Sequence, residues 1–217
     1  MRLYLIRHGE TEWSLSGRHT SRTDLSLTAK GADAARELAP WLRGVPFAHM
    51  LTSPLRRARQ TCELAGLGAA VETALELSEW DYGDYEGLRS ADIHKDRPDW
   101  DVFQDGCPHG ETPQQVSDRA DRLIASLHGT DGDIALFSHG QFGCVLAARW
   151  IGLAAAEGQH LSLGPASLSI LGHRLGYPGV RSIALWNATP ASMFGGHGPP
   201  APDAASACIA NTAKTSW

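Results

Sequence analysis

Cysteine is scarce in this sequence, and its spacing is irregular. The 217 residues include four cysteines, Cys62, Cys107, Cys144 and Cys208, and no two of them form a CxxC pair. Disulfide scaffolds and zinc ribbons need denser or paired cysteines. We therefore expect reduced thiols and no metal site.

Long apolar runs and blocks of basic residues are also missing. No stretch approaches the ~20 apolar residues that a membrane-spanning helix needs, and the first residues resemble a core strand rather than a signal peptide. The formal net charge is -5, so a phosphate-rich polymer would be repelled over most of the surface. These absences predict a cytoplasmic protein whose partners include neither nucleic acid nor a membrane.

The composition is that of a globular chain. With 42% hydrophobic and 20% charged residues in 217, the sequence fits one sizeable domain better than two. From about residue 190 the chain turns to Gly, Pro, Ala and Ser, a composition typical of a tail. We expect a single domain over 1–189 and a C-terminal tail over 190–217.

Strand and helix patterns alternate along the proposed domain. Residues 2–8 are apolar on both faces, as in a strand buried between helices. A helical stripe runs from Thr28 to Gly44, 47–53 reads as a second strand, and Ser53-Pro54 and Thr112-Pro113 each resemble a capped helix start. Further strands are expected at 133–140, 167–173 and 181–187, with a helix at roughly 142–152. The order predicts a three-layer α/β/α sandwich with a mostly parallel central sheet.

Residues 81–111 interrupt this alternation with polar and aromatic sequence. We expect the region to be inserted and to cover an edge of the sheet as a lid. Trp80, Trp100 and Phe103 are expected to form the core of this lid rather than to stack on a substrate, because aromatic residues bury a large area wherever a small insertion needs stabilising.

Polar side chains follow three of the predicted strands at the points where they end. These ends are Arg7-His8, Thr52-Ser53 and Ser138-His139, and the second strand leads into a helix whose first turn carries Arg56 and Arg57. Ligands of open α/β sheets bind outside the carboxyl ends of the strands, and a helix N-terminus favours an anion. Arginine matches phosphate oxygens, while a neutral imidazole keeps a lone pair that can attack phosphorus. The sequence therefore predicts a site that binds a phosphate group and can accept the phosphoryl group on a histidine.

Four motifs in order extend this interpretation. The segments "RHGET", "TSPLRRARQT", "LSEWDYGDYEG" and "SHG" together resemble the histidine phosphatase superfamily, the phosphoglycerate mutase-like fold, from residue 2 to about 187. The segments "EWSLSGRHTSRTDLSLT" and "FQDGCPHGETPQQ" are similar to the small sugar-phosphate phosphatases, including the sedoheptulose bisphosphatase-like branch. The resemblance implies a metal-independent phosphatase without a cofactor, acting on a small phosphomonoester.

The resemblance also implies roles for individual residues. His8 would be the nucleophile that becomes phosphohistidine, and Glu79 would protonate the leaving oxygen and later take a proton from water. Asp81 and Asp84 lie close enough in sequence to compete for that acid role. The remaining implied contacts are Arg7, Arg57 and His139 on the phosphate oxygens, Ser14, Thr20 and Ser21 as further phosphate donors, Tyr82 and Gln141 on the substrate side, and the Gly140 N–H.

We expect no catalytic role for Arg56 or for the eight remaining histidines. Arg56 is expected to face solvent or to form an ion pair. The eight remaining histidines are expected to be surface or structural residues, and His19 and His109 are the two that could prove otherwise.

Two departures from the family pattern bear on specificity. Relatives often carry "HGHxxR" or "HGNxxR", where this chain has Gln141 and, at the basic position, Cys144. Ser14 stands where phosphoglycerate mutases often have asparagine, and the short insertion lacks their arginine pair. Both points favour hydrolysis over transfer between two phosphorylated ligands, because a shorter lid excludes water less well.

Three other functions remain open alternatives. A phosphoglycerate mutase would transfer phosphate without releasing it, and a non-catalytic phosphoprotein-binding module would hydrolyse nothing. A metalloenzyme built on His8 and His139 is less favoured, because Arg7 and Arg57 would repel a cation. A homodimer could form through an edge strand or through the tail.

Overall fold

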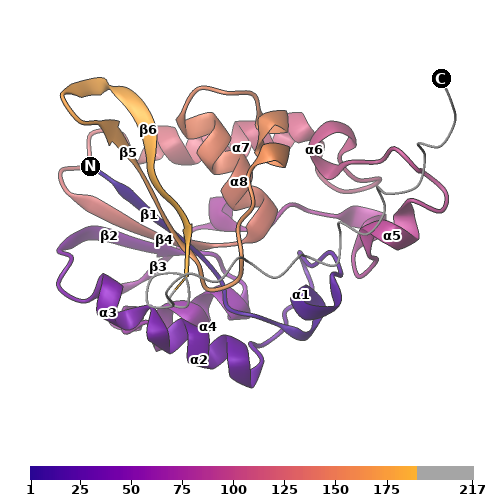
Figure 1. Ribbon diagram of the computed structural model, residues 1–217, viewed down its shortest axis with the longest axis horizontal. Helices are drawn as coiled ribbons and strands as arrows, with labels where there is room; N and C mark the ends of the chain where they lie inside the picture. The colour runs from indigo at the N-terminus through magenta and orange to yellow at the C-terminus, as the bar shows by residue number, and fades with distance from the viewer. Residues whose placement is uncertain (190–217) are drawn as a thin grey trace, which may run out of the picture.

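The computed structural model describes residues 1–189, and its centre is a six-stranded sheet (Figure 1). The strand order is β3-β2-β4-β1-β5-β6. Strands β1 to β4 are parallel to one another, whereas β5 and β6 run antiparallel to their neighbours. The bounds are β1 (Leu3–Arg7), β2 (Phe47–Thr52), β3 (Glu72–Thr73), β4 (Asp133–Ser138), β5 (Leu168–Arg174) and β6 (Tyr177–Ala188). The prediction of a mostly parallel α/β sheet is confirmed.

Helices cover both faces of the sheet (Figure 1). One face carries α2 (Ala29–Glu37), α3 (Ala39–Leu42) and α4 (Arg56–Leu64), and the other carries α7 (Pro113–Ser126) and α8 (Gly140–Trp150). The shorter elements are α1 (Glu12–Ser16), α5 (Ser90–Ile93), α6 (Val102–Asp105), and the 3-10 turns η1 (Gly68–Ala70), η2 (Leu75–Leu77), η3 (Gly83–Tyr85) and η4 (Ala155–His160).

The apolar sequence of β1 is explained by the burial of both of its faces. Leu3 and Leu5 belong to the hydrophobic cluster that includes α7 and α8, whereas Tyr4 and Ile6 belong to the cluster beneath α2 and α4. Burying each large aliphatic side chain contributes about 1.5–3 kcal/mol. Because both faces of β1 are buried, its carboxyl end is held firmly from two sides.

The structure corrects the extent of one predicted helix and the start of another. The stripe from Thr28 to Gly44 is divided between α2 and α3 at Leu38, because Pro40 lacks the N–H that would continue the first helix. The helix expected to begin after Ser53 begins at Arg56, with no side-chain cap on Leu55. The Ser53 hydroxyl lies 2.7 Å from His139 Nε2, and at 3.3 Å it accepts a hydrogen bond from Leu55 N.

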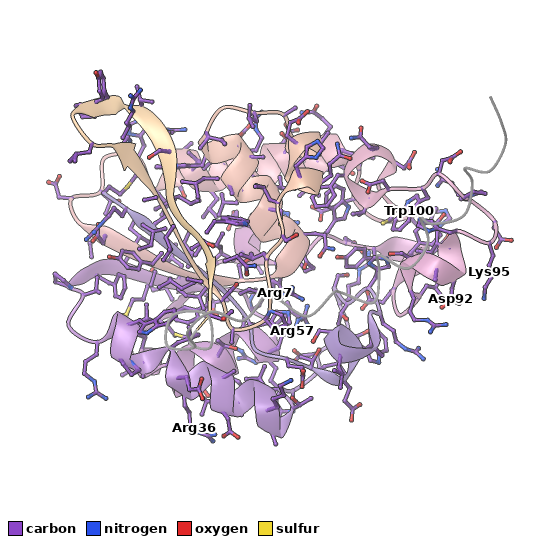
Figure 2. All side chains as sticks on the ribbon, viewed as in Figure 1. Arg7, Arg36, Arg57, Asp92, Lys95 and Trp100 are labelled. Carbon is purple, nitrogen blue, oxygen red and sulfur yellow. The ribbon has the colours of Figure 1, made fainter. Side chains whose placement is uncertain are left out.

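The region 81–111 lies at the carboxyl edge of the sheet, with α5 far from the strands' amino ends (Figure 1). Its aromatic residues are core residues, as expected. Trp80 is completely buried, Trp100 and Phe103 are nearly so, and all three belong to the cluster that includes α7 and α8. Figure 2 shows Trp100 beside α5, and its indole N–H donates to Gly106 O at 2.8 Å.

The remaining expectations concern the C-terminal tail, the cysteines and membrane-spanning helices. The Gly/Pro/Ala-rich tail, 190–217, and Cys208 lie outside the described residues. The other three cysteines have buried free thiols, and burial raises each thiol pKa to about 12. Among residues 1–189, the helices are all too short or too polar to cross a bilayer.

Candidate active site

The carboxyl end of β1 places Arg7 and His8 at the centre of the candidate site. The His8 N–H donates to Ser138 O at 3.0 Å, which ties this end of β1 to the end of β4. Gly9 follows, and a Cβ at this position would lie 2.4 Å from Gly31 O. Only glycine lets the loop pack this closely on the start of α2, so the sequence "RHG" fixes the backbone that carries His8.

The hydrogen bond of His8 determines which of its ring nitrogens is free. His8 is 4% exposed, and its Nδ1 lies 2.7 Å from the Gly9 carbonyl oxygen. A carbonyl can only accept, so Nδ1 carries the hydrogen and the lone pair of the neutral ring is on Nε2. Burial lowers the His8 pKa well below 6.5, and the charges of Arg57 and Arg7 lower it further. His8 is therefore a neutral imidazole whose lone pair is on Nε2.

Arg7 contributes a donor that the protein leaves unused. Its Nη1 donates to Leu163 O, but its buried Nε has no hydrogen-bond partner among the described residues. An unpaired buried donor is costly, and a charged one more so. Burial lowers the Arg7 pKa, although the Glu79 carboxylate opposes this effect. Arg7 also lines the cavity together with His8, so its positive charge favours an anion bound there.

His139 and Arg57 lie against His8 from the direction of β4 and α4. The His8 and His139 ring centroids are 5.1 Å apart. Arg57 Nε donates to His139 Nδ1 at 3.2 Å, so His139 Nε2 carries its hydrogen and donates to Ser53 Oγ. Burial and the charge of Arg57 lower the His139 pKa well below 6.5, so this ring is also neutral. Figure 2 shows Arg7 and Arg57 near each other at the centre of the molecule.

The Glu79 carboxylate is held by main-chain N–H groups. Oε1 accepts from Trp80 N at 2.9 Å and from Phe142 N at 2.8 Å, and Oε2 accepts from Gln141 N at 3.1 Å. Two of these donors are in the first turn of α8, where the helix dipole favours a negative charge. Oε2 makes the fewer bonds, so it is the oxygen better able to exchange a proton.

A cavity of about 200 Å³ brings most of the predicted residues together. Three of the five expected catalytic residues line it: Arg7, His8 and Glu79. Four of the expected binding residues also line it: Ser14, Thr20, Tyr82 and Gln141. Burial, reinforced by the negative charge of Glu79, raises the Tyr82 pKa well above 10, so its phenol is neutral.

Four expected residues lie outside the cavity wall. Arg57 is completely buried and donates to Thr23 O at 3.1 Å, to other main-chain carbonyls and to His139, behind His8. Ser21 donates its hydroxyl to Glu86 Oε2 at 3.0 Å, and Gly140 packs under the Arg7 guanidinium. His139 is fully buried between Arg57 and Ser53. Of these four residues, His139 packs against the His8 ring and Arg57 binds His139, whereas Ser21 and Gly140 contact Glu86 and Arg7.

Three polar wall residues are missing from the predicted site: Arg18, His19 and Ser90. Arg18 and His19 follow Ser14 closely in the sequence and directly precede Thr20, and this closeness to two predicted residues was the available signal. Ser90 begins α5 in the inserted region, where no local pattern marks it. His109, the other histidine singled out, is exposed and lies 2.8 Å from an Asp84 carboxylate oxygen.

His19 is neutral in this wall. Its ring packs 4.6 Å from the ring of Tyr82 and 5.4 Å from that of Trp100. Burial lowers the His19 pKa to about 4, although the carboxylate of Glu86 opposes the shift. The cavity thus combines a charged floor at Arg7 with a neutral polar wall, and the exposed Arg18 adds a positive charge.

Known proteins resemble this chain over nearly its whole described length. An acid phosphatase of Mycobacterium tuberculosis is 43% identical, with 87% of this chain and 93% of that protein covered. A sedoheptulose 1,7-bisphosphatase of Saccharomyces cerevisiae is 36% identical over 72% of this chain and 69% of that protein. Proteins of Salmonella named as probable phosphoglycerate mutases are 32% identical over 78% of this chain and 83% of their own.

A solved structure shares the fold. The structure of a Mycobacterium tuberculosis open reading frame product superposes with a TM-score of 0.82 and 40% identity, covering 87% of this chain and 98% of that one. The histidine phosphatase superfamily (branch 1) matches residues 3–189, which contain the four motifs and the cavity. The chain therefore belongs to the histidine phosphatase superfamily, branch 1.

Proposed function

We propose that this protein is a metal-independent phosphatase that hydrolyses a small phosphomonoester through a phosphohistidine on His8. The observation that carries the proposal is the tautomer of His8. Its Nδ1–H is bound to Gly9 O, which leaves the Nε2 lone pair for attack, and the charged Arg7 lines the same cavity. The acid phosphatase and the bisphosphatase among the relatives support hydrolysis.

The proposed first step transfers the phosphoryl group to His8. Nε2 forms a bond to phosphorus while the bond from phosphorus to the leaving oxygen breaks. Glu79, which has taken up a proton before this step, gives that proton to the leaving oxygen, which would otherwise depart as a high-energy alkoxide. Arg7 offsets the negative charge on the phosphoryl oxygens, and Arg57 and His139 are proposed to assist from behind His8.

The proposed second step regenerates the enzyme. Water attacks phosphorus, the bond from phosphorus to Nε2 breaks, and its electron pair returns to the ring. Glu79, now ionised, takes a proton from the attacking water. Inorganic phosphate leaves, and both His8 and Glu79 return to their starting protonation states.

A sugar phosphate is the proposed class of substrate. Beyond the charged floor, the wall presents neutral hydrogen-bonding groups: Ser14, His19, Tyr82, Ser90 and Gln141. Neutral donors and acceptors of this kind match the hydroxyl groups of a sugar, and the exposed Arg18 in the same wall offers a positive charge to a second phosphate. The bisphosphatase relative, named for a sugar bisphosphate, points the same way.

The proposal also covers the cellular location, the partners and the oligomeric state of the protein. The net charge of -5 favours a cytoplasmic protein without nucleic-acid or membrane partners. Strand β6 forms one edge of the sheet and is a candidate surface for a homodimer. Light scattering of the full chain and of a chain ending at residue 189 tests whether a dimer forms and whether the tail carries it.

The decisive experiment measures phosphate release with EDTA present. The panel contains sugar mono- and bisphosphates, phosphoglycerates and 4-nitrophenyl phosphate, tested on the parent, on His8→Ala and on His160→Ala as an exposed histidine control. We expect release by the parent and the control, and none by His8→Ala. Transfer from a bisphosphate to phosphoglycerate without release would instead favour a mutase, and phosphopeptide binding without hydrolysis would favour a binding module.

A further inference from the structure

Arg119 makes an unusually complete set of hydrogen bonds next to Glu79. It lies on the buried face of α7 and is 9% exposed. A guanidinium has five N–H donors in a rigid fork, and all five are used here. Nε and Nη2 donate to the Glu111 carboxylate at 2.9 and 2.7 Å.

The other three donors bind the main chain that leads to Glu79. Nη1 donates to Glu76 O at 2.8 Å and to Ser78 O at 2.7 Å, and Nη2 donates to Glu79 O at 3.3 Å. The segment has no regular strand or long helix of its own beyond η2, so these bonds replace the ladder that would otherwise fix it. Arg119 thus holds the backbone of the proposed acid directly.

Arg119 and Glu111 also constrain the groups around the Glu79 carboxylate. The Arg119 guanidinium lies 4.4 Å from the Phe142 ring centre, and Phe142 N donates to Glu79 Oε1. Glu111 Oε2 accepts from Asp81 N at 2.9 Å, and Glu111 O accepts from the Trp80 indole at 2.9 Å. The ion pair therefore contacts the chain on both sides of Glu79 and one residue that binds its carboxylate.

We infer that Arg119, braced by Glu111, is a positioning residue that sets the Glu79 carboxylate for proton transfer to the leaving group. Neither residue lines the cavity with His8, so neither can contact the substrate there. Both line a second cavity of about 320 Å³, which Glu79 also lines. The inference rests on the proposed function, because it assumes that Glu79 is the acid. Misplacement of a catalytic group by about 1 Å can lower a rate by about 100-fold.

The test uses the dependence of kcat/KM on the leaving group. This quantity covers only the steps up to departure of the alcohol or phenol, so the later role of Glu79 as a base does not enter. Glycerol phosphate has a poor leaving group that needs a proton, whereas 4-nitrophenyl phosphate has a good one that hardly does. The ratio of the two kcat/KM values is also independent of how much of a preparation is folded.

The variants are Arg119→Lys, which keeps the charge but not the five-donor fork, and Glu79→Gln, which removes the acid. Arg149→Lys is the matched control, because Arg149 makes a similar two-bond ion pair with Asp121 between α7 and α8, away from the site. The ratio of interest is kcat/KM for glycerol phosphate divided by kcat/KM for 4-nitrophenyl phosphate. We expect Glu79→Gln to lower this ratio by about 100-fold and Arg119→Lys to lower it by about tenfold. Arg149→Lys should leave the ratio unchanged.

The outcomes separate the two proposals. A loss in Arg119→Lys that is equal for both substrates, with a changed ratio in Glu79→Gln, overturns the positioning role alone. An unchanged ratio in Glu79→Gln overturns the acid role and the positioning role with it. Glu111→Gln is a second variant, and we expect it to lower the same ratio of kcat/KM values by a smaller factor. Failure of both Arg119→Lys and Glu111→Gln to fold would make the pair purely structural and would also overturn the inference.

Discussion

The pH dependence of stability gives a direct test of the buried environment of His19. In the folded protein the His19 pKa is about 4, against an ordinary value of 6.5, mainly because the ring is buried between Tyr82 and Trp100. Between these values the unfolded chain binds a proton that the folded chain does not bind. The stability contributed by neutral His19 is therefore fully present above pH 6.5 and is lost as the pH falls toward 4.

The size of the effect follows from the two pKa values. Each pKa unit corresponds to about 1.36 kcal/mol, so the difference between 6.5 in the unfolded chain and about 4 in the folded chain gives about 3 kcal/mol. A loss of this size is a large fraction of the ~5–15 kcal/mol that stabilises a typical domain. It should appear almost completely between pH 6.5 and pH 4.

The assay is urea unfolding of the parent and of His19→Phe at several pH values between 4 and 7.5. Phenylalanine keeps a ring against Tyr82 and Trp100 but cannot titrate. Because His8, His139 and the carboxylates remain in both proteins, the difference between the two curves isolates His19. We expect the parent to lose about 3 kcal/mol more than His19→Phe on acidification. Parallel curves for the two proteins would refute the reasoning, and His160→Phe, at an exposed site, should behave like the parent.

Three further predictions concern the same region. The acid limb of kcat/KM against pH should lie below 6.5, because burial and two arginines disfavour protonation of His8; a limb at or above 6.5 would contradict this. Gly9→Ala should lower the free energy of unfolding by about 1–3 kcal/mol and reduce kcat, since its Cβ would meet Gly31 O, and unfolding and rate assays that match the parent would speak against that packing. Thr112→Ala should cost about 1 kcal/mol in urea unfolding with little change in kcat, because Thr112 caps α7 through Gln115 N; an unchanged midpoint would argue against the cap.

Much of the fold was predictable because local and tertiary signals agree in it. Strand β1 is apolar on both faces because helices cover both, and α7 begins at Thr112-Pro113 with the expected capping box. The errors arise where one residue serves two structural demands. Ser53 resembles a helix cap, but His139 binds its hydroxyl, and α4 begins two residues after Pro54. Such competition between partners is set by the fold and is not visible in the local sequence.

The site was predictable to the extent that it sits on strand ends. Parallel strands bring their carboxyl ends together, so Arg7 and His8 could be placed near His139 from order and pattern alone. The direction in which a buried arginine points depends on distant carbonyl groups, and Arg57 donates to Thr23 O and neighbouring carbonyls that no spacing rule identifies. Ser90 enters the wall from an inserted region whose path has no periodic signal.

The two guanidinium groups disfavour a positive charge on the His8 ring both before and after the proposed transfer. Before it, Arg7 and Arg57 disfavour the imidazolium and so keep the nucleophile neutral. After it, Nε2 carries the phosphoryl group while Nδ1 keeps its hydrogen against Gly9 O, and the ring becomes cationic. That cation is repelled by the same arginines, and only the negative oxygens of the attached phosphoryl group offset the repulsion. The same charges thus attract the phosphoryl oxygens while disfavouring the ring cation, which makes the ring a better leaving group when water attacks the proposed phosphohistidine.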